Sequence, residues 1–237
     1  MSDTSMSDGP LPDDEKSAPE DRETAGPLDE SEANAVRPYV DLGGVKIVPR
    51  PDLQLRLEVE EGSKRVIAVG IDYAGSTLQV QPFAAPRSSG LWHEVRGQIT
   101  EQIKKQGGET TERAGAFGPE LIARIPVAGA AEGTTRVARF IGVDGPRWFL
   151  RALLTGPAAT DPTEAAALEA ALRAVVVDRG TEAMAVRNPL PLRLPKEVTE
   201  QASTGLETDQ DASAMDGDEA SGMPSLPDRG PEITERR

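Results

Sequence analysis

Hydrophobic and polar residues alternate in several short segments of the chain, and this pattern predicts strands. The clearest case is Leu53–Glu60, where apolar residues occupy every second position, as in a strand with one buried and one solvated face. Residues 64–73 and 76–84 follow after short turns, so the three segments together predict an antiparallel meander. Four further strands are predicted at residues 109–114, 120–127, 134–143 and 146–155.

Two segments instead have a helical period. Four apolar residues spaced along one helical face predict a helix at about residues 89–106, with Ser88 or Ser89 as its cap. Asp161-Pro-Thr-Glu164 has the order of an N-cap, a proline at the first helical position and a capping-box glutamate, so a second helix should run from there to about Val177. Residues 181–195 contain three prolines and predict an extended strap. The element order indicates an α+β fold, a mostly antiparallel sheet of about six or seven strands packed with two helices.

The distribution of charged residues predicts where the folded domain begins and ends. Residues 1–37 contain eleven acidic and three basic residues, and residues 198–237 contain ten acidic and three basic residues. Both segments are also rich in small and polar residues, so we expect two acidic, disordered tails around a single domain at residues 38–197. That domain has twenty basic and nineteen acidic residues, so the net charge of −14 belongs to the tails.

Candidate chemistry is sparse. The chain has no cysteine and one histidine, His93, and none of the common nucleotide-binding, hydrolase or zinc motifs is present. We therefore assign no catalytic, cofactor-binding or metal-binding residue, expect no cofactor, and favour a role other than catalysis. The first sixteen residues lack the features of a signal peptide, and the longest apolar-rich run is too short to span a bilayer, so we expect a cytoplasmic protein without a membrane partner.

The strands at 134–143 and 146–155 predict a hairpin. A two-residue turn at Asp144-Gly145 would pair Phe140 with Phe149. Arg139 then falls on the apolar face, so it needs a buried partner unless a bulge shifts the register.

The polar face of this hairpin is a candidate binding surface, because aromatic rings between arginines suit base stacking and phosphate neutralisation. Its residues are Arg136, Phe140, Arg147, Phe149 and Arg151. The alternative, which we favour, is that a helix covers this face and the arginines reach out around its edge.

Four strings of the sequence stand out together. They are the hairpin string Phe140–Arg151, Gln81–Pro86, Leu91-Trp92 with the following Glu94–Arg96, and the terminal Gly230–Glu235. With these strings the chain resembles an actinobacterial family of proteins with a domain of unknown function, number 3710. The resemblance implies no established activity and no catalytic residues. It also draws attention to a motif near the end of the acidic tail, which could form an extended hook on a sheet edge. The residues of this motif are Gly230, Pro231, Glu232, Ile233 and Thr234.

Three hypotheses about function follow. The first is a non-enzymatic interaction module with a protein partner. The second is a binder of single-stranded nucleic acid or another polyanion, which its own acidic tails would inhibit. The third is a cysteine-free enzyme of unknown reaction.

Overall fold

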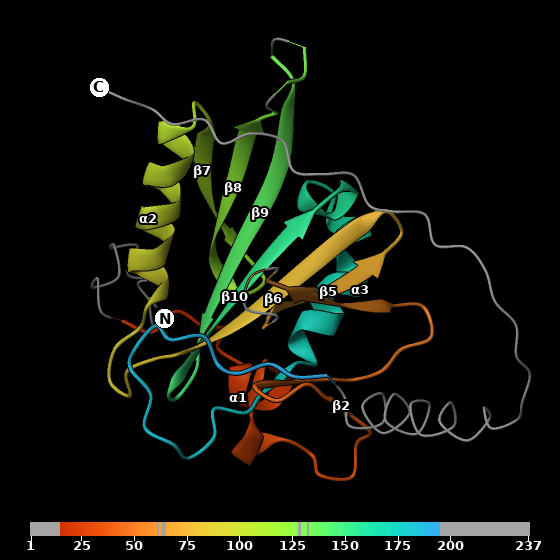
Figure 1. Ribbon diagram of the computed structural model, residues 1–237, viewed down its shortest axis with the longest axis vertical. Helices are drawn as coiled ribbons and strands as arrows, with labels where there is room; N and C mark the ends of the chain where they lie inside the picture. Colours follow the sequence, from red (N-terminus) through yellow and green to blue (C-terminus); the bar gives the residue numbers. More distant parts are fainter. Residues whose placement is uncertain (1–14, 61, 63–64, 128, 132, 195–237) are drawn as a thin grey trace, which may run out of the picture. The chain divides into compact units, whose positions relative to one another are not determined.

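The computed structural model describes residues 15–60, 62, 65–127, 129–131 and 133–194 (Figure 1). The chain divides into two units, Met1–Thr199 and Glu200–Arg237, and every described residue belongs to the first. The predicted C-terminal tail and its motif at Gly230–Thr234 lie outside the described residues, as do residues 1–14.

A seven-stranded antiparallel sheet dominates the described unit, with strand order β4-β5-β6-β10-β9-β8-β7. The strands are β4 (Gln54–Val59), β5 (Val66–Tyr73), β6 (Ser76–Ala84), β7 (Glu109–Gly115), β8 (Gly118–Pro126), β9 (Thr135–Asp144) and β10 (Trp148–Thr155). Each corresponds to one predicted strand, and the α+β class is confirmed. Alternation of apolar and polar residues located β4, β6 and β8, because a half-buried strand places apolar residues at every second position.

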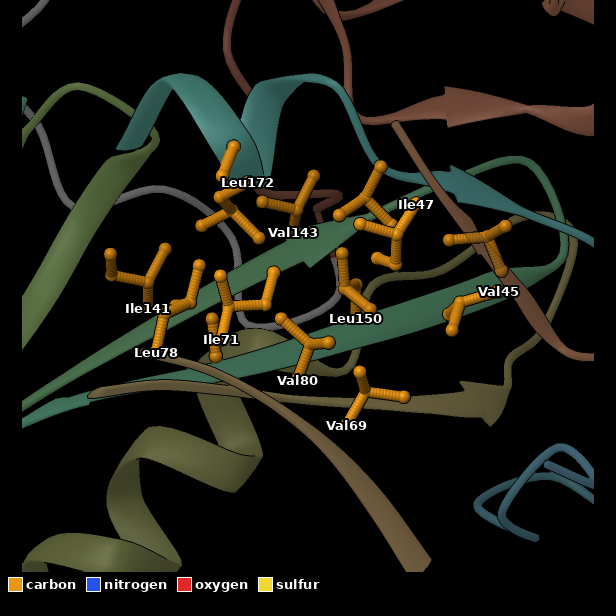
Figure 2. Close-up of a cluster of buried hydrophobic side chains, with 14 of the residues drawn as sticks. Val45, Ile47, Val69, Ile71, Leu78, Val80, Ile141, Val143, Leu150 and Leu172 are labelled. Atoms are coloured by element: carbon orange, nitrogen blue, oxygen red, sulfur yellow. The ribbon is translucent and has the colours of Figure 1, made fainter. Parts of the chain in front are cut away.

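Two helices cover different parts of the sheet. α2 (Trp92–Lys105) contacts β7, β8 and β9, and α3 (Pro162–Arg173) contacts β5 and β6 (Figure 1). We call the face under α3 the inner face and the face under α2 the outer face. The inner core includes Ile71, Val80, Val143 and Leu150 (Figure 2). A second, smaller cluster lies between α2 and the outer face. α2 covers the β7–β8–β9 part of the outer face and reaches Phe149 at the start of β10, and among the described helices none lies over the outer face of β5 and β6.

A second, four-stranded sheet was not predicted. It has the order β1-β11-β3-β2 and consists of β1 (Leu28–Asp29), β2 (Val40–Asp41), β3 (Val45–Ile47) and β11 (Val176–Val177). Strands of two or three residues are too short to show alternation. The predicted extension of the second helix to Val177 is wrong for the same reason, since the helix ends at Arg173 and the next apolar residues enter β11.

Residues 15–37 differ from the expected disordered tail, so the ordered part of the chain begins well before residue 38. They contain α1 (Arg22–Ala25) and the short 3-10 helix η1 (Glu30–Glu32). Arg22 is 6% exposed and donates to both carboxylate oxygens of Glu32 at 2.7 Å. Asp29 accepts a hydrogen bond of 2.9 Å from the Trp148 indole N–H. The high charge content of this segment suggested disorder, but composition does not show that oppositely charged residues such as Arg22 and Glu32 pair with each other.

The caps of the two helices have different origins. Asp161 caps α3 as predicted, by accepting from the backbone N–H groups of Thr163 and Glu164. The prediction of Ser88 or Ser89 as the cap of α2 is wrong, because α2 begins after Leu91 and has no cap from its own side chains. Asp144, at the end of β9, instead accepts from the backbone N–H of Leu91 at 2.8 Å and of Trp92 at 3.4 Å.

The predicted register of the β9–β10 hairpin is also wrong. Phe149 pairs with Asp144, and Phe140 pairs with Leu153, four residues beyond the expected partner. The chain turns through residues 145–148, where the Gly145 N–H donates to the Trp148 carbonyl at 2.8 Å, and not at a two-residue Asp-Gly turn. Because the shift is an even number of residues, every side chain stays on its predicted face.

Candidate binding groove

The two aromatic residues of the predicted binding surface are not available for base stacking. Phe149 is 2% exposed and lies against Trp92 of α2, with ring centroids 6.1 Å apart. Phe140 is half-buried against the same cluster. Gly142 allows this close packing, because a Cβ at that position would lie 2.2 Å from the Trp92 ring. The covering helix that we favoured is therefore present over this part of the sheet.

The three arginines of that surface are also separated from one another. Arg136 is exposed near the start of β9, where it pairs in register with Ile125. Arg147 is exposed in the turn that follows the other end of β9. Arg151 lies in the middle of β10, half-buried on the outer face. Arg136 and Arg147 therefore lie at opposite ends of β9, and the three arginines of the predicted surface do not gather at one place.

Arg151 has an unusual environment for a half-buried arginine. Its guanidinium donates to the side-chain oxygen of Gln81 and lies 5.5 Å from the centroid of the Phe83 ring. Within the described part of the chain it forms no ion pair with a carboxylate. Burial lowers the pKa of Arg151. The guanidinium is thus partly desolvated, and none of the described carboxylates pairs with it to compensate.

A groove lies over Arg151 where α2 leaves the sheet uncovered, and we call it the outer groove. It has a volume of about 510 Å³. Its lining comprises Glu60, Arg65, Val66, Ile67, Gln81, Phe83, Arg151 and residues 189–194. Eight of these thirteen residues are apolar, and the others are Glu60, Gln81, Arg65, Arg151 and Arg193.

The predicted extended strap forms one wall of the outer groove. Leu190 donates its backbone N–H to the Pro82 carbonyl at 2.9 Å, and Pro189 forms a bridge with Phe83 of β6. Leu192 forms a bridge with Val66 of β5. The strap is thus held against both strands, which fixes the width of the groove.

A smaller pocket adjoins the outer groove on the side of α2, and we call it the α2 pocket. It has a volume of about 170 Å³ and shares Phe83 and Arg151 with the outer groove. Its other lining residues are Leu91, Val95, Gln98, Phe149 and Arg187. Arg187 is paired with Glu94, so Arg151 is the pocket's cation without a carboxylate partner among the described residues.

Arg139 has the buried partner that the sequence required. It is 3% exposed on the inner face and donates two hydrogen bonds of 2.7 Å to the Glu120 carboxylate, which is fully buried. A carboxylate oxygen of Glu169 on α3 lies 2.6 Å from the same guanidinium. This arginine is therefore structural, although it lies on the same hairpin as Arg151.

Other candidate chemistry is limited in the described residues. No group of three or more histidine, aspartate or glutamate side chains is placed there to hold a metal ion. None of the helices described is long and apolar enough to cross a membrane.

Sequence reasoning identified Arg151 but not its neighbours Gln81 and Phe83. The alternation of residues 76–84 places both on the outer face, and Gln81 is paired in register with Arg151. Pairing of β6 with β10 joins segments about seventy residues apart, so no local pattern shows it. Pro189 and Leu192 line the groove because the strap pairs with β6 and β5, and the sequence does not show where the strap meets the sheet.

Comparison with known proteins gives a family and little more. The model of the protein family of unknown function DUF3710 matches residues 26–201. No curated protein matches the chain. A crystal structure from Bacteroides thetaiotaomicron VPI-5482 is similar, with 13% identity and a TM-score of 0.39 over 75% of this chain. The match spans 63% of that protein's chain, and a likeness this weak carries no argument about function.

Proposed function

This chain belongs to the DUF3710 family of proteins of unknown function, and we propose from its own residues that it is a non-enzymatic interaction module of the cytoplasm. The outer groove binds an acidic group of a protein partner, and Arg151 pairs with the carboxylate.

The state of Arg151 is the observation that carries this proposal. A half-buried guanidinium has lost hydration, and its described partners, an amide oxygen and an aromatic ring, do not replace it fully. A carboxylate can accept two parallel hydrogen bonds from a guanidinium, and such charge-assisted bonds are about twice as strong as neutral ones. The carboxylate of an acidic ligand would therefore compensate for the hydration that the guanidinium has already lost in the free protein.

The walls of the groove favour a polypeptide as the source of that carboxylate. Ile67 is 41% exposed and Leu194 is 53% exposed, and both line the groove. The groove combines apolar side chains with arginines, and such a lining matches a chain segment that offers apolar residues around an acidic one. A single-stranded nucleic acid would instead need exposed rings for its bases, and Phe149 is 2% exposed.

The test compares the wild-type protein with Arg151→Met for binding to short blocked peptides. Each peptide has a central glutamate in an apolar context and is paired with a version in which glutamine replaces that glutamate. We expect wild type to prefer glutamate by about 30-fold, because removing one partner of a desolvated charge pair costs about 2 kcal/mol or more. Arg151→Met should lose this preference.

A single-stranded oligonucleotide serves as the competing ligand in the same assay. Equal binding of the glutamate and glutamine peptides by wild type would overturn the proposal. Binding of the oligonucleotide that depends on Arg151 and falls steeply with salt would favour the polyanion hypothesis instead.

A further inference from the structure

The α2 pocket suggests a more specific ligand than an acidic group alone. It opens beside Arg151 on the same face of the sheet, and the Phe83 ring borders both the pocket and the outer groove. A ligand whose carboxylate reaches Arg151 therefore has the mouth of the α2 pocket next to it. This argument rests on the proposed function of Arg151.

The size and chemistry of the α2 pocket fit one aliphatic side chain. Its volume of about 170 Å³ is close to the roughly 150 Å³ of an apolar protein cavity that binds benzene. Val95 of α2 is half-buried at its side, and Phe149 and Leu91 are buried behind it. Filling such a pocket with a branched aliphatic group removes apolar surface from water on both partners.

The geometry also sets the spacing between the two groups. In an extended peptide successive side chains point to opposite faces, and residues two apart point to the same face about 6.6 Å from each other. The Arg151 guanidinium lies 5.5 Å from the Phe83 centroid, and the Phe83 and Phe149 centroids are 6.1 Å apart. Arg151 and Phe83 also line the α2 pocket themselves, so a carboxylate at the guanidinium and a side chain in the pocket lie side by side, as same-face side chains of an extended peptide do.

We propose that the site recognises an extended segment of a partner protein in which an acidic residue and an aliphatic residue are separated by one residue. The carboxylate pairs with Arg151, and the aliphatic side chain enters the α2 pocket. Charge complementarity and the apolar pocket beside the cation together select this ligand over a purely acidic one.

The experiment uses blocked peptides with the central sequence Glu-Thr-Ile and three variants of it. In one variant alanine replaces isoleucine, in one glutamine replaces glutamate, and in one the order is Thr-Glu-Ile, so that the two groups are adjacent. Chemical-shift titration of the full-length protein measures their relative affinities. We expect the alanine and adjacent-order peptides to bind about 10-fold more weakly and the glutamine peptide about 30-fold more weakly.

Two substitutions on α2 test the pocket from the side of the protein. Val95→Trp fills the α2 pocket and should abolish the preference for isoleucine over alanine while the preference for glutamate remains. Gln102→Trp adds the same ring at an exposed position of the same helix and should leave both preferences unchanged.

The outcomes separate this inference from the proposed function. If glutamate is preferred through Arg151 but alanine and adjacent-order peptides bind as tightly as Glu-Thr-Ile, the two-part recognition is wrong and the proposed function stands. If wild type and Arg151→Met bind all four peptides alike, both proposals are wrong.

Discussion

Replacing Arg139 with methionine should destabilise the fold strongly, because it leaves a buried carboxylate without its main partner. In the native structure Glu120 is fully buried and accepts two hydrogen bonds of 2.7 Å from Arg139. The remaining described partner would be Arg113, which is 3.3 Å away with a side chain 39% exposed. Breaking one side of a buried ion pair costs about 3–5 kcal/mol, since the other charge is then uncompensated.

The free energy of unfolding can be measured by urea titration with tryptophan emission as the signal. The chain has two tryptophans, Trp92 and Trp148, both with 0% exposure, and they lie in the outer and inner clusters respectively. A loss of about 3–5 kcal/mol should also lower the melting temperature by roughly 6–20 °C for a chain of this size. Both tryptophans should report the same transition if the sheet unfolds as one unit.

The double substitution Arg139→Met with Glu120→Met separates the loss of an ion pair from the loss of packing. Removing both charges leaves no fully buried carboxylate without a partner, so most of the lost stability should return, to within about 1 kcal/mol of wild type. Glu169→Gln is a milder control, because that carboxylate is 24% exposed and can be hydrated. A cost of less than about 1 kcal/mol for Arg139→Met, or a double variant no more stable than the single one, would refute this reasoning.

Three other predictions concern stability. Arg151→Met should leave the free energy of unfolding unchanged or raise it by up to about 1 kcal/mol in urea titration, because the guanidinium is desolvated without a described carboxylate partner; a clear loss would contradict the proposed role. The hydrogen bonds from Arg22 hold the pKa of Glu32 below its usual 4.5, so this contribution to stability is present above pH 4.5 and lost as pH falls through the lowered pKa. Glu32→Gln should therefore be less stable than wild type near pH 7 and should converge with it in acid, and a gap independent of pH would count against the pairing. Asp144→Ala should cost about 1–2 kcal/mol in urea titration, because it removes the acceptor that caps α2, and a neutral effect would show that the cap contributes little.

The large sheet could be predicted from the sequence because its strands are long enough to alternate. The nine residues of β6 alternate between buried and half-buried positions, as their sequence pattern predicts. The buried face predicted for Leu53–Glu60 is wrong, because β4 is an edge strand in which Leu55 is 37% exposed and Val59 is 48% exposed. The alternation of side chains along β10 also predicted which face of the sheet Arg151 lies on. That prediction holds because the register is shifted by an even number of residues. The small sheet and the cap of α2 could not be predicted, because each depends on contacts between distant segments. Asp144 lies 53 positions from Leu91 in sequence, and no local pattern links them.

The candidate groove illustrates the same limit on a larger scale. Arg151 was singled out from the sequence, but the uncovered part of the outer face and the neighbours Gln81 and Phe83 arise from the order of strands in the sheet. The two arginines of one hairpin show why this order matters for function. Arg139 faces the inner side and has two acidic partners there, so its charge is satisfied within the fold. Arg151 faces the outer side beside an opening and has none among the described residues, and on our proposal a ligand supplies to Arg151 the compensation that folding supplies to Arg139.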